Sequence, residues 1–332
     1  MRRLAPLLAA LTLTVAACGT KKDPVTPASA DRLTVMLDFF PNADHGALYA
    51  AQAAGDFRQA ALNVRIQTPP DPATPLKLLL ARKVDLAVSY EPELLLARDK
   101  GAPLVAVGAL VQRPLTSIIA LDSTKIHNPG DLRGKKVGTA GIPYQAAYLK
   151  TILARAHVDP HTVHEVNVGF DLVPAMLTKR VDATLGGYWN YEAIQLAQKR
   201  KRATVIRVDQ AGVPTYDELV LVARRDFLAA QGGKVRRFVQ ALARGDAALR
   251  RDPKPALDAL VRANPQASRG LQEASLRATL PAFAPPPGKP YGYLDPVRWA
   301  AYGEWMQSNR LLHRPPRAET ALTDEFLAGQ GG

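Results

Sequence analysis

Short runs of β-branched and other apolar residues alternate along the chain with longer segments whose apolar residues recur at helical spacing. Short apolar runs predict strands, and a period near 3.6 residues predicts amphipathic helices. Alternation of the two predicts mainly parallel sheets covered by helices. The strand-like runs form two series, so we expect two sheets in two lobes. The first series comprises residues 33–37, 62–67, 84–89 and 104–110, and the second comprises residues 136–139, 164–168, 181–185 and 204–208.

Two further strand-like runs follow the two series: residues 116–121 come after the first series, and residues 218–223 come after the second. We expect them to carry the chain from one lobe to the other and back. The segment after the return keeps a helical apolar spacing, which predicts a helical C-terminal tail. The aromatic stripe of Trp299, Tyr302 and Trp305 in that tail predicts core packing. The predicted fold class is therefore α/β and bilobal, with residues 33–120 and 218–332 in lobe 1 and residues 121–217 in lobe 2.

One pattern occurs twice, over residues 76–89 and 173–186. Each copy predicts a helix, a short turn and a buried strand, followed by an aromatic residue and an acid. Ligands of open parallel sheets lie beyond the carboxyl ends of the strands, so both lobes should present such side chains to the gap between them. A chance likeness between two βα units remains the alternative. The matching residues are Leu80, Arg82 and Asp85 in the first copy and Leu177, Lys179 and Asp182 in the second.

The N-terminus has the layout of an export signal: Arg2 and Arg3 precede an apolar run over residues 4–16. That run is too short to span a bilayer. Two alanines stand directly before Cys18, the sole cysteine, and this arrangement resembles a bacterial lipobox. We expect a signal peptide over residues 1–17, a lipid on Cys18 and a tether over residues 18–32, hence an exported protein held at a membrane surface. An ordinary signal with an incidental cysteine is the alternative.

Charge and cysteine usage narrow the function classes. The formal charge is +13, of which Arg2 and Arg3 supply two, leaving +11 after signal removal. The one dense basic run, residues 199–202, lacks interleaved aromatic residues and lies at a predicted helix end, where cations interact favourably with the helix dipole. We therefore expect no nucleic-acid partner and some attraction to anionic membrane surfaces. We also expect a monomer. Because Cys18 is the sole cysteine, cysteine catalysis, cysteine metal sites and disulfides within the chain are excluded.

Catalytic signatures are missing from the sequence. It contains no G-x-S-x-G elbow, no H-E-x-x-H and no phosphate loop ending in Lys, so we predict neither an enzyme nor a resident metal or cofactor. The histidines at 157, 161 and 164 lack a cysteine or suitably spaced carboxylate nearby, which favours solvated loop residues over a metal site. The glycine-rich segment at residues 138–141 follows a strand and could hold a polar ligand group through its backbone N–H groups. Its role stays open.

The stronger constellation combines aromatic, amide and carboxylate side chains directly after predicted strands. Flat aromatic rings with such partners suit a planar heterocycle that both stacks and forms hydrogen bonds. The alternative assigns Asp38 and Asn42 to turns and Asn190 to a helix cap. Our candidates for stacking are Phe39, Tyr90 and Trp189, those for hydrogen bonding are Asn42, His45, Glu91, Asn190, Glu192 and Tyr216, and Asp38, Tyr144 and Tyr188 complete the predicted site.

Four segments carry a specific resemblance, namely residues 37–45 (LDFFPNADH), 90–93 (YEPE), 187–192 (GYWNYE) and 214–219 (PTYDEL). They resemble the thiamine-precursor pyrimidine receptors of ABC importers, and the similarity runs from about residue 33 to 225. The resemblance implies a type II periplasmic-binding-protein fold that closes around its ligand, a permease partner, and a ligand such as N-formyl-4-amino-5-aminomethyl-2-methylpyrimidine. Phe39-Phe40 departs from the family, whose members often carry a tryptophan there.

Two rival functions remain. The related fungal pyrimidine synthase shares the fold but resembles an enzyme with a cysteine-rich motif that uses pyridoxal phosphate and iron. This chain has no cysteine after Cys18, which favours a receptor. The other rival is a receptor for a sulfonate, nitrate or flavin precursor. Glu91 and Glu192 would not help to bind an anion, so we expect the aminopyrimidine.

Overall fold

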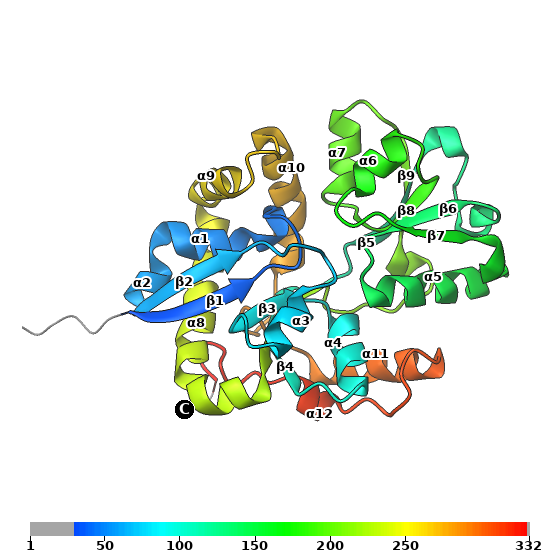
Figure 1. The fold of residues 1–332 in the computed structure, drawn as a ribbon. Helices are drawn as coiled ribbons and strands as arrows, with labels where there is room; N and C mark the ends of the chain where they lie inside the picture. The colour runs from blue at the N-terminus through cyan, green and yellow to red at the C-terminus, as the bar shows by residue number, and fades with distance from the viewer. Residues whose placement is uncertain (1–29, 331–332) are drawn as a thin grey trace, which may run out of the picture.

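The computed structural model describes residues 30–330 as two lobes, each built on a five-stranded sheet (Figure 1). The predicted signal peptide, Cys18 and nearly all of the predicted tether lie outside the described residues. Between residues 30 and 330, no helix has the length and apolar character needed to cross a membrane.

The first sheet has the strand order β2-β1-β3-β10-β4. β1 runs parallel to β2 and β3, whereas β10 runs antiparallel to both of its neighbours. Every residue of β4 and β10 is buried, as expected of strands covered on both faces. The strands are β1 (Asp31–Met36), β2 (Leu62–Gln67), β3 (Leu86–Ser89), β4 (Leu104–Val111) and β10 (Leu219–Arg224).

The second sheet repeats this plan with the order β7-β6-β8-β5-β9. Three strands are mutually parallel, and β5 runs antiparallel between β8 and β9. In each sheet four strands thus run one way and one crossing strand runs the other way, which confirms the predicted α/β fold with mainly parallel sheets. The strands are β5 (Thr116–Leu121), β6 (Lys136–Thr139), β7 (His164–Asn167), β8 (Ala183–Tyr188) and β9 (Ala203–Arg207).

Helices cover both sheets. In the first lobe α1 packs on α8 and α9, and α3 and α4 pack on β3, β4 and β10. In the second lobe α5 lies on one side of the sheet and α6 and α7 lie on the other (Figure 1). The helices are α1 (Gly46–Ala54), α2 (Asp56–Gln59), α3 (Pro75–Leu80), α4 (Glu91–Asp99), α5 (Pro143–Arg155), α6 (Leu172–Leu177), α7 (Glu192–Gln198), α8 (Arg225–Arg251), α9 (Lys254–Ala263), α10 (Arg269–Thr279), α11 (Pro296–Ser308) and α12 (Ala318–Ala321).

The crossing strands correct the lobe boundary expected at residue 120. β5 pairs with β8 and β9, so it belongs to the second sheet and not to the first. Thr116, Ile118 and Ile119 are all buried. Their backbone N–H and C=O groups therefore need hydrogen-bond partners on both edges of the strand, which β8 and β9 supply. We therefore propose that the chain crosses between Val111 and Thr116 and returns just before β10.

The repeated sequence pattern corresponds to repeated structure. Arg82 and Lys179 occupy equivalent turns, and both have a left-handed backbone with φ of 59°. The Asp85 carboxylate accepts from Thr34 N at 2.7 Å, and the Asp182 carboxylate accepts from Lys136 N at 2.8 Å. Asp85 stands directly before β3 and Asp182 directly before β8, and each thereby ties its strand to the parallel neighbour, β1 in one lobe and β6 in the other.

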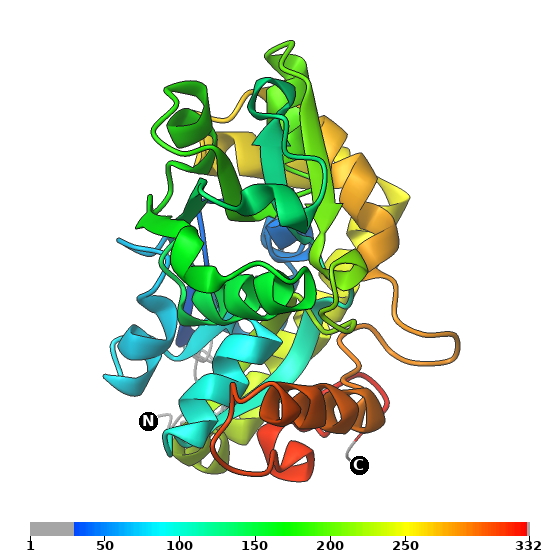
Figure 2. The same ribbon diagram turned by 90° about the vertical axis from the view of Figure 1, so that its right-hand side faces the viewer.

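The C-terminal tail touches both lobes. Trp299 and Tyr302 of α11 are fully buried, as the core-packing prediction required. The Tyr302 hydroxyl bonds the Tyr148 hydroxyl of α5, and the Trp305 ring lies 6.2 Å from that of Tyr148. Figure 2 shows α11 near the base of the molecule, below α5. The tail therefore braces the two lobes close to the crossing strands.

Candidate functional site

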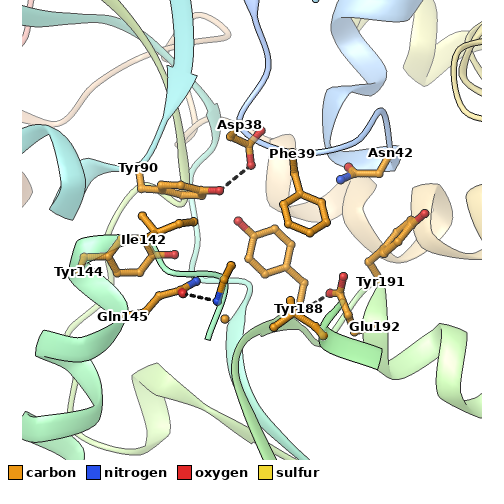
Figure 3. Close-up of a pocket in the computed structure, with 13 residues that line it drawn as sticks. Asp38, Phe39, Asn42, Tyr90, Ile142, Tyr144, Gln145, Tyr188, Tyr191 and Glu192 are labelled. Atoms are coloured by element: carbon orange, nitrogen blue, oxygen red, sulfur yellow. Dashed lines mark hydrogen bonds between the residues drawn. The ribbon is translucent and has the colours of Figure 1, made fainter. Parts of the chain in front are cut away.

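A pocket lies between the lobes at the carboxyl ends of the parallel strands (Figure 3). Lobe 1 contributes residues that follow β1 and β3. Lobe 2 contributes residues of the segment between β6 and α5, of α5, α6 and β8, of the segment after β8 and of α7. The lining residues are Asp38, Phe39, Asn42, Tyr90, Ala140, Ile142, Tyr144, Gln145, Leu172, Gly186, Tyr188, Tyr191 and Glu192.

Asp38 anchors the lobe 1 wall. It is buried, and its Oδ2 accepts from the Tyr90 hydroxyl at 2.8 Å while its Oδ1 bonds His45 Nε2 at 2.7 Å. His45 Nδ1 accepts from Asn42 N at 3.2 Å, so the neutral ring with its proton on Nε2 fits both contacts. Burial, and then the Asp38 carboxylate, raise the pKa of Tyr90 well above its usual value. Tyr90 therefore stays a neutral donor that orients Asp38.

Asn42 is both a cap and a pocket residue. Its Oδ1 accepts from Asp44 N at 2.8 Å and so begins the short 3-10 helix η1 (Ala43–His45). The cap fixes the side chain, and its amide nitrogen turns toward the pocket (Figure 3). The turn role and the ligand role considered for Asn42 are thus compatible.

Gln145 forms the corresponding donor on the lobe 2 wall. Its Oε1 accepts from Ala140 N at 2.8 Å, which leaves Nε2 as a donor. Gly186 makes room for it, because a Cβ at Gly186 would stand 2.2 Å from Gln145 Nε2. Gly186 also has φ of +110°, a conformation that residues with a side chain rarely adopt. Tyr144 precedes Gln145 on α5, and its ring lies 5.1 Å from that of Tyr90 across the lobes.

Glu192 begins α7, where its Oε2 accepts from Tyr188 N at 2.6 Å. Burial raises the pKa of Glu192 to about 7, although the bond from Tyr188 N opposes this rise. The Tyr188 and Phe39 rings lie between the Tyr90–Tyr144 side and the Tyr191–Glu192 side of the pocket (Figure 3). Two carboxylates, Asp38 and Glu192, therefore face an aromatic pocket that has no Lys or Arg in its lining.

A third buried carboxylate, Glu218, lies beneath the pocket between the crossing strands. Its Oε2 accepts from Leu115 N at 2.6 Å, from Thr116 N at 2.8 Å and from the Tyr216 hydroxyl at 3.0 Å. Its Oε1 accepts from Thr116 Oγ1 at 2.8 Å. Burial raises the pKa of Glu218 to about 7 against the effect of these donors. Glu218 stands directly before β10 and thereby ties it to the start of β5.

Three phenylalanines from both lobes meet at Phe39, which lines the pocket. The Phe170 ring of lobe 2 lies 4.8 Å from that of Phe39 and 4.1 Å from that of Phe40. The cavity that the pocket residues leave between them has a volume of about 20 Å³. The lobes thus lie close together, and a heterocycle would need them to separate before it could enter.

Comparisons with known proteins agree with this geometry. Residues 42–256 match the family model described as NMT1/THI5 like. The formylaminopyrimidine-binding protein of Halalkalibacterium halodurans is 33% identical over 321 residues, which cover 96% of each chain. The chain belongs to the NMT1/THI5-like family.

Two further comparisons give another relative of this chain and a solved structure with a similar fold. A Haemophilus influenzae protein whose name assigns it to thiamine biosynthesis is 37% identical, covering 85% of this chain and 88% of the relative. The alkanesulfonate-binding protein of Xanthomonas axonopodis pv. citri has a TM-score of 0.68 at 17% identity, covering 89% of this chain and 99% of that chain. That likeness shows the fold alone, and it confirms the predicted periplasmic-binding-protein fold.

The structure brings seven of the twelve predicted site residues together in the pocket lining. They come from all three predicted clusters and from α5: Asp38, Phe39, Asn42, Tyr90, Tyr144, Tyr188 and Glu192. The other five lie outside the lining.

Trp189 and Glu91 each follow a lining tyrosine but lie away from the pocket. Trp189 Nε1 donates to Pro114 O at 3.1 Å, and the Arg207 guanidinium lies 5.2 Å from the centre of its ring. The Glu91 carboxylate accepts from Asp217 N at 2.7 Å, and burial raises its pKa well above the usual value.

The remaining three predicted residues lie outside the lining and form hydrogen bonds with buried residues around the pocket. His45 holds Asp38, and Tyr216 holds Glu218. Asn190 bonds Asp44 and Thr279 of the opposite lobe.

Six lining residues were not among the predicted ligands. Ala140 and Tyr191 belong to segments that the sequence had already singled out, so their neighbours gave a signal. Gln145 and Gly186 approach each other only through the packing of α5 on β8, which no local pattern reveals. The six are Ala140, Ile142, Gln145, Leu172, Gly186 and Tyr191.

Across residues 30–330, no group of three or more His, Cys, Asp or Glu side chains is arranged to hold a metal ion. The histidines at 157, 161 and 164 are exposed on the surface of lobe 2.

Proposed function

We propose that this protein is an exported, lipid-anchored receptor that delivers an aminopyrimidine precursor of thiamine to an ABC permease without transforming it. The observation that carries the proposal is the pocket lining, which offers aromatic rings, two carboxylates and two amide donors, and no basic side chain. Such a lining suits a neutral or cationic heterocycle.

The polar groups match the edge of an aminopyrimidine. An exocyclic amine donates two hydrogen bonds, which Asp38 and Glu192 can accept. Ring nitrogens accept hydrogen bonds, which the amide groups of Asn42 and Gln145 can donate. The tyrosine and phenylalanine rings supply flat surfaces for stacking. These are the complementary features on which an orientation-specific small-molecule site depends.

The relatives support the same ligand class, because one is named for formylaminopyrimidine binding and another for thiamine biosynthesis. A sulfonate or nitrate would meet two carboxylates and no cation in this pocket, which disfavours the anion-receptor rival. The other rival is an enzyme like the fungal pyrimidine synthase, which carries a cysteine-rich motif. The lining contains no cysteine, lysine or histidine side chain that could hold or serve such chemistry.

A ligand panel tests the proposal. Binding to the folded protein alone should stabilise it by about 2.7 kcal/mol at a hundredfold excess over Kd. We expect formylaminopyrimidine or the parent aminopyrimidine to raise the melting temperature and to be recovered unchanged after incubation. A rise in melting temperature with taurine or nitrate but with neither pyrimidine would contradict the proposal. Chemical conversion of the recovered pyrimidine would show that the protein is an enzyme.

The anchor is tested separately. Metabolic labelling with a fatty-acid analogue should mark the wild-type protein and leave Cys18→Ser unlabelled, because Cys18 supplies the sole thiol of the chain. Equal labelling of both proteins would remove the lipid anchor from the proposal.

A further inference from the structure

Asn190 joins the two lobes without entering the pocket. It follows β8 in lobe 2, and its Nδ2 donates to Asp44 Oδ1 and to Thr279 Oγ1, each at 2.6 Å. Asp44 lies in η1 and Thr279 ends α10, so both partners belong to lobe 1. All three side chains are buried, and none of them lines the pocket. These three residues form the interlobe latch.

The latch exists only while the lobes are close together. α10 of lobe 1 faces α7 of lobe 2 beside it (Figure 1), and these two helices are in contact. Asn190 stands two residues before α7 and therefore moves with lobe 2. Separation of the lobes would break both of its hydrogen bonds and expose all three side chains to water.

The latch combines a favourable hydrogen bond to a carboxylate with the unfavourable burial of two acceptors. A hydrogen bond to a carboxylate is stronger than one between neutral groups. Against this gain, Asp44 Oδ2 and Asn190 Oδ1 are buried with no donor among the described residues. A buried acceptor without a donor carries a desolvation penalty. A contact of this kind favours closure modestly and can still open.

We propose that Asn190 is a positioning residue: through the interlobe latch it holds the closed form and sets how long the ligand stays, without touching the ligand. The apparent Kd varies inversely with the fraction of protein that can adopt the binding-competent form, so residues remote from the ligand can control affinity. The choice of ligand rests on the function proposed above, whereas the closure itself does not.

The sharpest test compares Asn190→Asp with a charge swap, the double variant that also carries Asp44→Asn. Asn190→Asp sets two buried carboxylates against each other, so ligand binding should weaken roughly tenfold or more. The dissociation rate should rise, because opening of the liganded protein no longer has to break the latch, whereas the association rate should not fall. Adding Asp44→Asn restores one amide and one carboxylate with the donor reversed and the net charge unchanged. The double variant should return to within about threefold of wild type.

The matched control is Asn63→Asp. It makes the same substitution at an exposed position of the edge strand β2 in lobe 1, away from the latch, and should leave both rate constants unchanged. A double variant no better than Asn190→Asp alone, or an Asn190→Asp that behaves like the control, would overturn the proposal.

A measurement without ligand separates this inference from the proposed function. Spin labels on Gln266→Cys in lobe 1 and Thr178→Cys in lobe 2, both exposed, report the lobe separation in a Cys18→Ser background. We expect Asn190→Asp to lengthen the mean distance and the charge swap to shorten it again. If every pyrimidine fails to bind but these distances change as expected, the proposed ligand is wrong and the latch stands. Identical distance distributions in all variants would overturn the latch.

Discussion

Glu192 faces the pocket with one carboxylate oxygen held by Tyr188 N and the other left for a ligand. Asp38 differs, because His45 and Tyr90 already hold both of its oxygens. A ligand amine should therefore gain most from Glu192. A hydrogen bond to a charged group contributes about 1.5 to 3 kcal/mol.

Glu192→Gln should weaken aminopyrimidine binding roughly tenfold to a hundredfold above pH 8. Burial raises the pKa of Glu192 to about 7, so below that pH the wild-type side chain is already neutral. The ratio of the variant's Kd to that of the wild type should fall toward one as the pH drops to about 5. Calorimetric titration across this range measures the ratio, and titration of the ligand itself cancels from it.

Glu304→Gln, at an exposed position on α11, is the matched control and should bind like wild type at every pH. A constant ratio for Glu192→Gln over the whole range would show that its charge does not act on the ligand.

Single residues also show what sequence could predict about the site. Tyr90, Tyr188 and their neighbours were predicted because side chains at the ends of parallel strands converge. Trp189 was predicted to stack but points away, since successive residues of extended chain face opposite sides and Tyr188 takes the pocket side. Gln145 gave no signal because its place depends on a glycine in a distant strand.

Among the elements, the crossing strands β5 and β10 are tied together by Glu218. Its two oxygens accept from two backbone N–H groups and from the hydroxyls of Thr116, Tyr188 and Tyr216. A glutamine in this place would keep only one of the two oxygens, and its amide group would face either the backbone N–H groups or hydroxyls that must turn to accept. The buried contact thereby fixes the geometry from which both lobes extend.

Glu218→Gln should lower the unfolding free energy by about 1 to 3 kcal/mol, the usual result of leaving buried donors without an acceptor. Chemical denaturation measures this, with Glu304→Gln as the exposed control expected to change it by no more than about 0.5 kcal/mol. Equal stability of the two variants would show that the Glu218 carboxylate does not hold the crossing strands.

Elements were far more predictable than contacts. Nine of the ten strands were predicted within two residues of their bounds, and β8 ends three residues later than predicted, because each strand is a short apolar run flanked by polar turns. The predicted boundary placed residues 116–120 in the first lobe, whereas β5 pairs within the second sheet, since strand pairing is a long-range choice that local periodicity does not encode. Asn190 illustrates the same limit, because its partners lie 146 and 89 residues away.

For the whole molecule, several buried acids make stability depend on pH. Burial raises the pKa values of Glu93, Glu192 and Glu218 from 4.5 to about 7. Between these values the folded protein holds protons that the unfolded chain has released. The unfolding free energy should therefore fall as the pH rises from 4.5 to 7, by up to about 1.4 kcal/mol per pH unit for each such proton.

Denaturant titrations of the unliganded protein at several pH values test this dependence. Glu93→Gln should make the fall shallower, because it removes one of the three groups while its partner Ser89 can still bond the amide. Asp131 and Asp258 have lowered pKa values and titrate below this window. A stability that rises between pH 4.5 and 7 would contradict the assigned shifts.

The place of β10 in the first sheet also dictates an order of events during synthesis. β3 and β4 do not pair with each other, because β10 lies between them. The ribosome must therefore translate all of β5 to β9 before the strand that joins β3 to β4 exists. The second lobe is continuous in sequence and can assemble first, whereas the first sheet stays in two separate parts until Arg224 has emerged.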